Sequence, residues 1–253
     1  MSAGALAEQQ VELATAADSA FMSDPWRWPA SGQSPPLLGG CFVAFALGEA
    51  GPGRAGDRAW AGAVTMYPAT GRTYHTDEEV VIAGAAGAAY EPGLLALREG
   101  PILSEAVESL GRRPDVLLVD ATGRDHPRRA GLALHLGAFA DIPSVGVTRR
   151  PLYATGSLPP LDRGASSPLV LAGEEVARWV CTRSGARPVV AHAGWRTDPA
   201  MAAQIVLAAT TAGARTPTPL REARRAARET RAVSEGRTRN STAHRATTSE
   251  SAI

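Results

Sequence analysis

The sequence predicts an α/β protein in which a mixed sheet is flanked by helices. Short apolar runs bounded by glycine or proline are typical of buried strands, and 41–47 and 116–119 are clear examples. Apolar residues at helical spacing recur between the later runs, which is the pattern of strands joined by helices. The run 116–119 ends in Asp120, followed by Gly123. It indicates a strand that ends at the carboxyl edge of a sheet, where open α/β sheets place their chemistry.

Composition sets limits on the class of protein. The 253 residues are 44% hydrophobic, enough for one sizeable domain, and no apolar run approaches the roughly 20 residues of a membrane span. The first ten residues lack the pattern of a signal peptide, so we expect a cytoplasmic protein. Cys41 and Cys181 lie in apolar context and are interpreted as buried thiols.

Every basic side chain in the chain is arginine, because the sequence contains no lysine. Arginine is the better bidentate partner of phosphate, so this choice suits a nucleic-acid binder. A lysine-free chain rich in Ala, Gly and Arg is also the product of a GC-rich genome, which we regard as the better explanation.

The first half of the chain predicts a helix, a linker and three strands. Apolar positions in 6–22 have helical spacing, and 25–40 is a linker rich in Pro, Gly and Ser. Strands are expected at 41–47, at 59–67 and in a run that ends near Val81. Since only short turns separate them, they form a meander of three.

The second half begins with a short helix from Leu94 that we expect to end at Gly100-Pro101, so that Glu99 lies at a helix break. A second helix then continues to Gly111. The segment 151–168 is expected to be a loop. Further strands are predicted at 116–119, 144–147, 176–182 and 188–192, and further helices at 129–140, 200–212 and 219–233.

Several motifs occur in a fixed order along the chain. They are Glu8–Ala14, the block Tyr90–Pro101 (YEPGLLALREGP), His126–Arg129 (HPRR), Gly131–Gly137 and Gly146–Arg150 (GVTRR). Together they resemble the endonuclease V family of deoxyinosine-directed nucleases, collinearly from about residue 7 to 230. The resemblance implies a ribonuclease H-like fold with a mixed five-stranded sheet. We therefore divide the chain into an amino-terminal helix and linker (1–40), an endonuclease V-like domain (41–233) and a disordered tail (234–253).

The resemblance also implies a chemistry. The family cuts the second phosphodiester bond 3′ of a deaminated base, in DNA repair or RNA processing. Its carboxylates hold Mg²⁺, which prefers hard oxygen ligands, activates a water and stabilises the leaving oxygen. We therefore expect a monomer whose partner is DNA or RNA, including strands that contain inosine, and no membrane partner.

By position in the family motifs, four residues match the catalytic site. Glu99 and Asp120 match two of the carboxylates that bind the metal, and His126 matches the histidine near the metal and the scissile phosphate. Arg149 stands where the family has a lysine. His192 matches a Gly-His element that supports the site, although such a histidine is more often structural.

Other matches concern the nucleic acid. A wedge that fills the gap left by the flipped base corresponds to Tyr90, Pro92 and Gly93. Gly123 falls in the turn that lines the base pocket, and Arg128 could clamp a phosphate, although arginines on helix surfaces are usually solvated. Base flipping costs a few kcal/mol, so a wedge and a closed pocket are expected together.

The sequence departs from the family pattern at two metal positions. Phe42 stands where the first-strand aspartate is expected, and Arg224 where the late acidic or imidazole ligand is expected. Two carboxylates alone bind Mg²⁺ weakly at best, so Mg²⁺ binding is weak or absent if the site is degenerate. Substitute carboxylates are conceivable at Glu49, Asp57 or Glu222.

Three hypotheses remain open. In the first, Arg224 pairs with Asp120 and the protein binds nucleic acid without metal catalysis. In the second, the chain is an active Mg²⁺-dependent endonuclease with a rearranged site, which a third carboxylate near Asp120 would favour. The third is a scaffold with no nucleic-acid role. A hydrogen bond between Arg224 and Asp120 favours the first.

Overall fold

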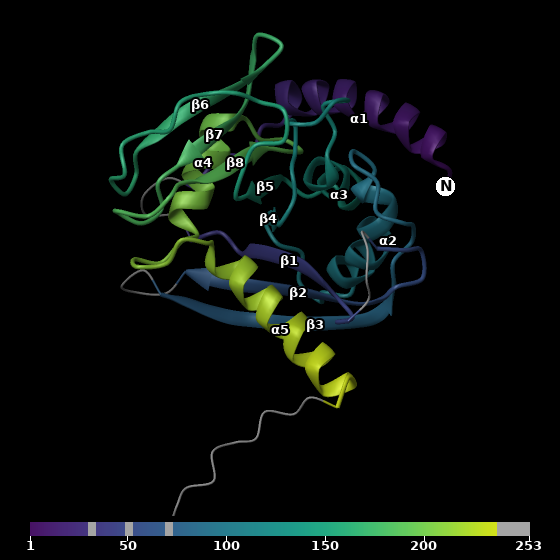
Figure 1. Cartoon of the computed structure of the whole chain (residues 1–253). Coiled ribbons are helices and arrows are strands. Elements are labelled where there is room, and N and C mark those ends of the chain that lie inside the picture. The colour runs from purple at the N-terminus through teal and green to yellow at the C-terminus, as the bar shows by residue number, and fades with distance from the viewer. Residues whose placement is uncertain (30–33, 49–52, 69–72, 237–253) are drawn as a thin grey trace, which may run out of the picture.

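The structure is a computed structural model that describes residues 1–29, 34–48, 53–68 and 73–236. One mixed eight-stranded sheet in the order β3-β2-β1-β4-β5-β8-β7-β6 forms its centre (Figure 1). The predicted α/β class is confirmed. The strands are β1 (Leu38–Phe45), β2 (Arg58–Pro68), β3 (Tyr74–Ala85), β4 (Val116–Val119), β5 (Ser144–Thr148), β6 (Ser166–Leu171), β7 (Glu174–Val180) and β8 (Val189–Ala193).

The expectation of five strands is wrong, because three further strands extend the sheet beyond β5. β8 pairs antiparallel to β5, and β7 and β6 then add in turn to the edge that β8 leaves. β6 lies partly within the segment 151–168, which we expected to be a loop. Its Pro168 is tolerated because β6 is an edge strand, where one side of the ladder needs no donors.

The register of the central strands determines which residues meet at the site. β1, β2 and β3 form the predicted antiparallel meander, and β1 runs parallel to β4. Cys41 pairs with Val119 at the end of the β1–β4 ladder. The next residues of the two strands, Phe42 and Asp120, are therefore neighbours at the carboxyl edge of β4.

Helices cover both faces of the sheet in the part of the chain that the structure describes (Figure 1). Because strand side chains alternate between faces, Cys41 and Val119 pack toward α2 and α3, whereas Leu38 and Leu118 pack toward α4 and α5. α1 packs outside α3 through a small apolar cluster. The helices are α1 (Ala3–Ser23), α2 (Leu95–Glu108), α3 (Leu132–Ala140), α4 (Pro199–Ala208) and α5 (Thr218–Ser234).

The predicted helix break at Gly100-Pro101 is wrong, since α2 continues through both residues. Proline removes one backbone donor and crowds the preceding turn. At this turn the Gly87 N–H bonds the carbonyl of Arg98 at 2.9 Å, so part of the hydrogen bonding comes from outside the helix. Glu99 consequently lies inside a continuous helix rather than at a break.

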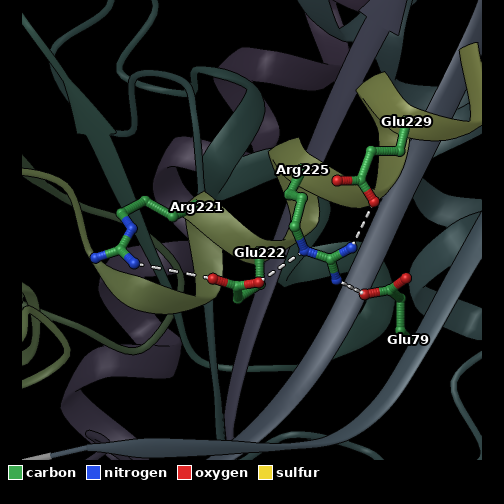
Figure 2. Close-up of polar contacts among 5 residues, drawn as sticks. All are labelled: Glu79, Arg221, Glu222, Arg225 and Glu229. Atoms are coloured by element: carbon green, nitrogen blue, oxygen red, sulfur yellow. Dashed lines mark hydrogen bonds and ion pairs between the residues drawn. The ribbon is translucent and has the colours of Figure 1, made fainter. Parts of the chain in front are cut away.

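Helix α5 is fixed to the sheet by a cluster of ion pairs around Arg225 (Figure 2). The guanidinium of Arg225 bonds Glu222 at 2.9 Å and Glu229 at 2.8 Å on the same helix, and it also bonds Glu79 of β3. On the neighbouring strand, a Cβ at Gly62 would lie 2.5 Å from the carbonyl oxygen of Ala223. This close approach and the ion pairs together set the rotation of α5.

Two further observations concern sequence predictions. Cys41 and Cys181 are both buried free thiols, as expected. In the part of the chain that the structure describes, no helix is long and apolar enough to cross a membrane.

Candidate nucleic-acid site

The carboxylate that ends β4 is paired with a guanidinium. Arg224, on α5, places Nη2 2.5 Å from Oδ2 of Asp120. Both side chains are partly shielded from water, with 19% and 32% exposed, so the pair is stronger than a surface ion pair. The structure therefore brings Asp120 and Arg224 into direct contact.

Phe42 supports this pair from β1. The guanidinium carbon of Arg224 lies 4.9 Å from the centre of the Phe42 ring, and that of Arg228 lies 5.5 Å from it. Arginine stacks well on aromatic faces because the ring is negative at its centre. One ring thus orients two guanidinium groups beside a single carboxylate.

Glu99 approaches the same place from α2. It lines a cavity of about 220 Å³ together with Phe42 and Asp120. Burial raises the pKa of Glu99 to about 7, with Arg98 opposing the shift and Asp120 contributing to it. Burial, Asp120 and Glu99 also raise the pKa of the Cys41 thiol, which stays protonated.

The residues that could have completed a metal site are engaged elsewhere or not described. Asp57 accepts a bond of 2.8 Å from Arg98, and Glu222 belongs to the Arg225 cluster. Glu49 lies outside the described residues. Among the described residues, no group of three or more His, Cys, Asp or Glu side chains could hold a metal ion.

A second cavity of about 220 Å³ lies between the wedge block and the carboxyl ends of β4 and β5. It shares Asp120 with the first cavity, and Tyr90 at its rim is 47% exposed. Its lining includes Gln10, Tyr90, Pro92, Gly93, Asp120, Thr122, His126, Thr148 and Leu152. The motif residues from four separate segments thus meet around one hollow.

The wedge block is anchored through the carbonyl of Gly93. This oxygen accepts bonds from Arg128 Nη2 at 2.8 Å, from His126 Nε2 at 3.0 Å and from Gln10 Nε2 at 3.4 Å. Gly93 has a φ of +80°, which favours glycine. The turn beside Tyr90 is therefore held by three side chains from α1 and the HPRR segment.

These bonds define the state of His126. The Arg128 N–H donates to Nδ1 at 3.2 Å, so Nε2 carries the ring hydrogen that it donates to Gly93. Burial lowers the pKa of His126 to about 4, with the bond to Gly93 and the charge of Asp125 opposing the shift and Arg128 contributing to it. His126 is a neutral imidazole with both nitrogens engaged.

Arg128 is similarly committed within the protein. Its Nε donates to Gln10 Oε1 at 2.7 Å in addition to its bond to Gly93. Gly123 leaves no room for a side chain, since a Cβ there would lie 2.0 Å from the carbonyl oxygen of Ala193. Arg149, by contrast, is exposed directly after β5.

The sequence pattern did not indicate Asp125, a fully buried carboxylate directly before the HPRR segment. It accepts backbone N–H bonds from Leu152 at 2.6 Å and from Tyr153 and Ala154 at 2.8 Å. Leu152 lines the second cavity, so Asp125 holds one wall of it in place. These partners lie 27 to 29 residues later in the chain, and no local pattern indicates them.

His192 is a buried structural neighbour of this carboxylate. The Thr148 hydroxyl donates to the carbonyl of Arg150 at 2.6 Å and accepts from His192 Nε2 at 2.8 Å. Nδ1 of His192 lies 3.8 Å from Asp125 Oδ2. Burial lowers the pKa of His192 to about 4 although Asp125 opposes the shift. The imidazole is neutral and ties β8 to the end of β5.

Comparison with known proteins shows which family this chain resembles. The endonuclease V family profile matches residues 43–225. An endonuclease V of Methanopyrus kandleri is 44% identical over 143 residues, which are 56% of this chain and 60% of that protein. The chain thus spans less than two thirds of the length of this relative.

Solved structures match over more of the chain. A Streptomyces avermitilis endonuclease V is 31% identical with a TM-score of 0.72, over 90% of this chain and 94% of that one. A Ciona intestinalis endonuclease V is 19% identical with a TM-score of 0.65, over 88% and 97% of the two chains. The latter was solved in complex with a DNA that contains an inosine followed by a ribo-adenosine. At this identity it shows the shared fold.

Proposed function

This chain belongs to the endonuclease V family, and we propose that it binds inosine-containing DNA or RNA without the metal-dependent cleavage typical of that family. The observation that carries the proposal is the 2.5 Å contact between Arg224 Nη2 and Asp120 Oδ2. A guanidinium occupies the side of Asp120 on which a metal ligand is expected from the family pattern.

The donor set at this place does not fit Mg²⁺. Asp120 is neutralised by Arg224, and the raised pKa of Glu99 favours its neutral carboxyl, a poorer Mg²⁺ ligand than a carboxylate. Phe42 offers no ligand atom. Mg²⁺ needs several hard oxygen ligands in near-octahedral geometry, and a fixed positive charge beside one carboxylate opposes its binding.

Recognition of the base rests on the second cavity. Tyr90, Pro92 and Gly93 supply the wedge, and the hollow beside them takes the flipped base. Gly123 keeps its turn free of side-chain bulk, and Asp125 fixes the wall at Leu152. The Ciona relative binds an inosine-containing DNA, which supports the same class of ligand here.

In this proposal the residues at the catalytic positions bind the phosphate backbone and position the wedge, and they do not cleave the strand. Arg224 supplies positive charge to a phosphate near Asp120, and exposed Arg149 adds a second guanidinium. His126 and Arg128 position the wedge through the Gly93 carbonyl. Because the His126 imidazole is neutral and doubly hydrogen-bonded, it does not transfer protons in this state.

A nicking assay tests the proposal. Inosine-containing duplex and single strands are incubated with Mg²⁺ or Mn²⁺, and binding is measured in the same samples. We expect binding without cleavage. Cleavage that disappears in Asp120→Ala contradicts the proposal and supports an active enzyme with a rearranged site, whereas absence of both binding and cleavage supports the scaffold hypothesis.

A further inference from the structure

We propose that five arginines at one edge of the sheet form a phosphate-binding track, which holds the backbone of a nucleic-acid strand beyond the Asp120 site. The track consists of Arg228, Arg224, Arg149, Arg187 and Arg183, and Arg215 braces it through bonds to backbone carbonyls. The inference rests on the proposed function, because it assigns the path of the same nucleic-acid partner.

The track starts at the stacked pair on Phe42. Arg224 and Arg228 lie over one ring, and Asp120 bonds Nη2 of Arg224 alone. Nε of Arg224 is buried without a hydrogen-bond partner. The pair therefore has more donors than Asp120 uses, and the exposed guanidinium of Arg228 is free to bond an additional anion.

The register of β5, β7 and β8 shows which arginines follow next along this edge of the sheet. Thr148, the last residue of β5, pairs with Val190 of β8, and Val189 pairs with Val180 at the end of β7. Arg149 follows β5, and Arg187 precedes β8. The edge that holds Arg149 thus also holds the turn between β7 and β8.

Arg215 connects this turn to α5. Its Nε donates to the carbonyl of Arg187 at 2.6 Å, and its Nη2 to that of Pro188 at 3.0 Å. Thr182, next to Arg183, donates to the carbonyl of Arg215 at 2.7 Å. The arginines of the turn are thereby held beside the segment that leads into α5.

The electrostatics agree with a shared surface. Burial lowers the pKa of Arg215, and Arg149, Arg187 and Arg183 lower it further. Burial, Arg224, Arg231 and Arg149 likewise lower the pKa of Arg228, with Asp120 opposing. Arg149 lowers the pKa of both Arg215 and Arg228, so its charge lies within electrostatic range of the turn between β7 and β8 and of the pair on Phe42. Closely spaced like charges of this kind are relieved by a polyanion such as a phosphodiester backbone.

The opposite edge of the sheet supplies a matched control. Arg112 and Arg113 precede β4, and their side chains are 59% and 58% exposed. Each is paired with a carboxylate, Asp77 at 3.6 Å and Asp141 at 3.5 Å. Their replacement removes the same charge as replacement of Arg183 and Arg187 without touching the track.

The test measures the salt dependence of binding to unmodified single-stranded DNA, to RNA of the same sequence and to the inosine-containing strand. The variants are Arg183→Gln with Arg187→Gln, and Arg112→Gln with Arg113→Gln. We expect the first pair to lower the slope of log affinity against log salt by about 1.4, because each lost single-strand contact removes about 0.7. The conservative pair Arg183→Lys with Arg187→Lys restores the slope.

The outcomes separate this inference from the proposed function. If the track is correct, the Arg183/Arg187 variant loses affinity for all three strands by the same factor, and its preference for inosine is unchanged. An effect no larger than that of the Arg112/Arg113 variant overturns the track and leaves the proposed function standing. A wild-type protein without affinity for any of the strands overturns both.

Discussion

Arg224 and Asp120 form a partly buried ion pair of 2.5 Å at the carboxyl edge of β4. Removal of one partner leaves the other without compensation, which costs more than removal of both. In a double-mutant cycle with Arg224→Met and Asp120→Asn, we expect a coupling free energy of about 1–2 kcal/mol in denaturant unfolding. Additive single effects would show that the contact contributes nothing to stability.

A second prediction concerns restoration of the metal site. Phe42→Asp with Arg224→His supplies the two ligand types that the family pattern expects beside Asp120 and Glu99. The double variant should gain Mg²⁺-dependent nicking of an inosine-containing strand, and each single variant should gain little. Asp120→Ala in the double-variant background is the control and should abolish the gain. If the single variant Phe42→Asp alone restores nicking fully, Arg224 is not the obstacle.

Base recognition predicts a specific effect at Tyr90. Tyr90→Ala removes the ring at the rim of the second cavity, so the preference for inosine over guanosine should fall to near unity while salt-sensitive binding persists. Phe139→Ala is the matched control, since Phe139 is a similarly exposed aromatic residue on α3 away from this cavity. Competition binding measures both. An unchanged preference in Tyr90→Ala argues against the wedge.

The buried carboxylate of Asp125 predicts a coupled loss of stability and of cavity shape. Asp125→Ala leaves three buried or partly buried N–H groups without their acceptor, and we expect a loss of about 2–4 kcal/mol in unfolding free energy. Hydrogen exchange at the amides of 152–154 should accelerate in the milder variant Asp125→Asn. Unchanged protection at these amides would contradict the anchoring role.

Acid should destabilise the protein through its buried histidines. The pKa of His135 is lowered by burial from 6.5 to about 4, so the histidine takes up its proton at a lower pH in the folded state than in the unfolded state. The contribution of neutral His135 to the free energy of unfolding is therefore fully present above pH 6.5. It is lost as the pH falls toward 4, by about 3 kcal/mol for a shift of this size. His126 and His192 act in the same direction. In urea unfolding, the free energy of unfolding of His135→Gln should depend less on pH between 6.5 and 4 than that of the wild type. An unchanged pH dependence would exclude His135 as a contributor.

Much of the fold follows from local patterns. The apolar runs around Cys41, Leu117 and Val145 predicted central strands because such runs persist only where both faces of a sheet are covered. The break expected at Pro101 did not occur, and α2 continues from Leu95 to Glu108 although Pro101 leaves the Leu97 carbonyl without its helical donor. β6 was missed because a proline-containing edge strand resembles a loop.

The site was predictable where it depended on order along the chain. The positions of Asp120 and Arg224 in the family motifs predicted that the two residues share one site. In the structure their side chains are in contact. The stack of Arg228 on Phe42 and the anchoring of Leu152 by Asp125 were not predictable. Both depend on contacts between distant segments that leave no local pattern.

The central claim is that a guanidinium has replaced the metal at Asp120, and a manganese titration tests it most directly. Mn²⁺ binding is followed by calorimetry for the wild-type protein, for Asp120→Ala and for the double variant Phe42→Asp with Arg224→His. The account predicts no Asp120-dependent binding in the wild type and such binding in the double variant. Wild-type binding that Asp120→Ala abolishes would contradict the account and identify a metal site that coexists with Arg224.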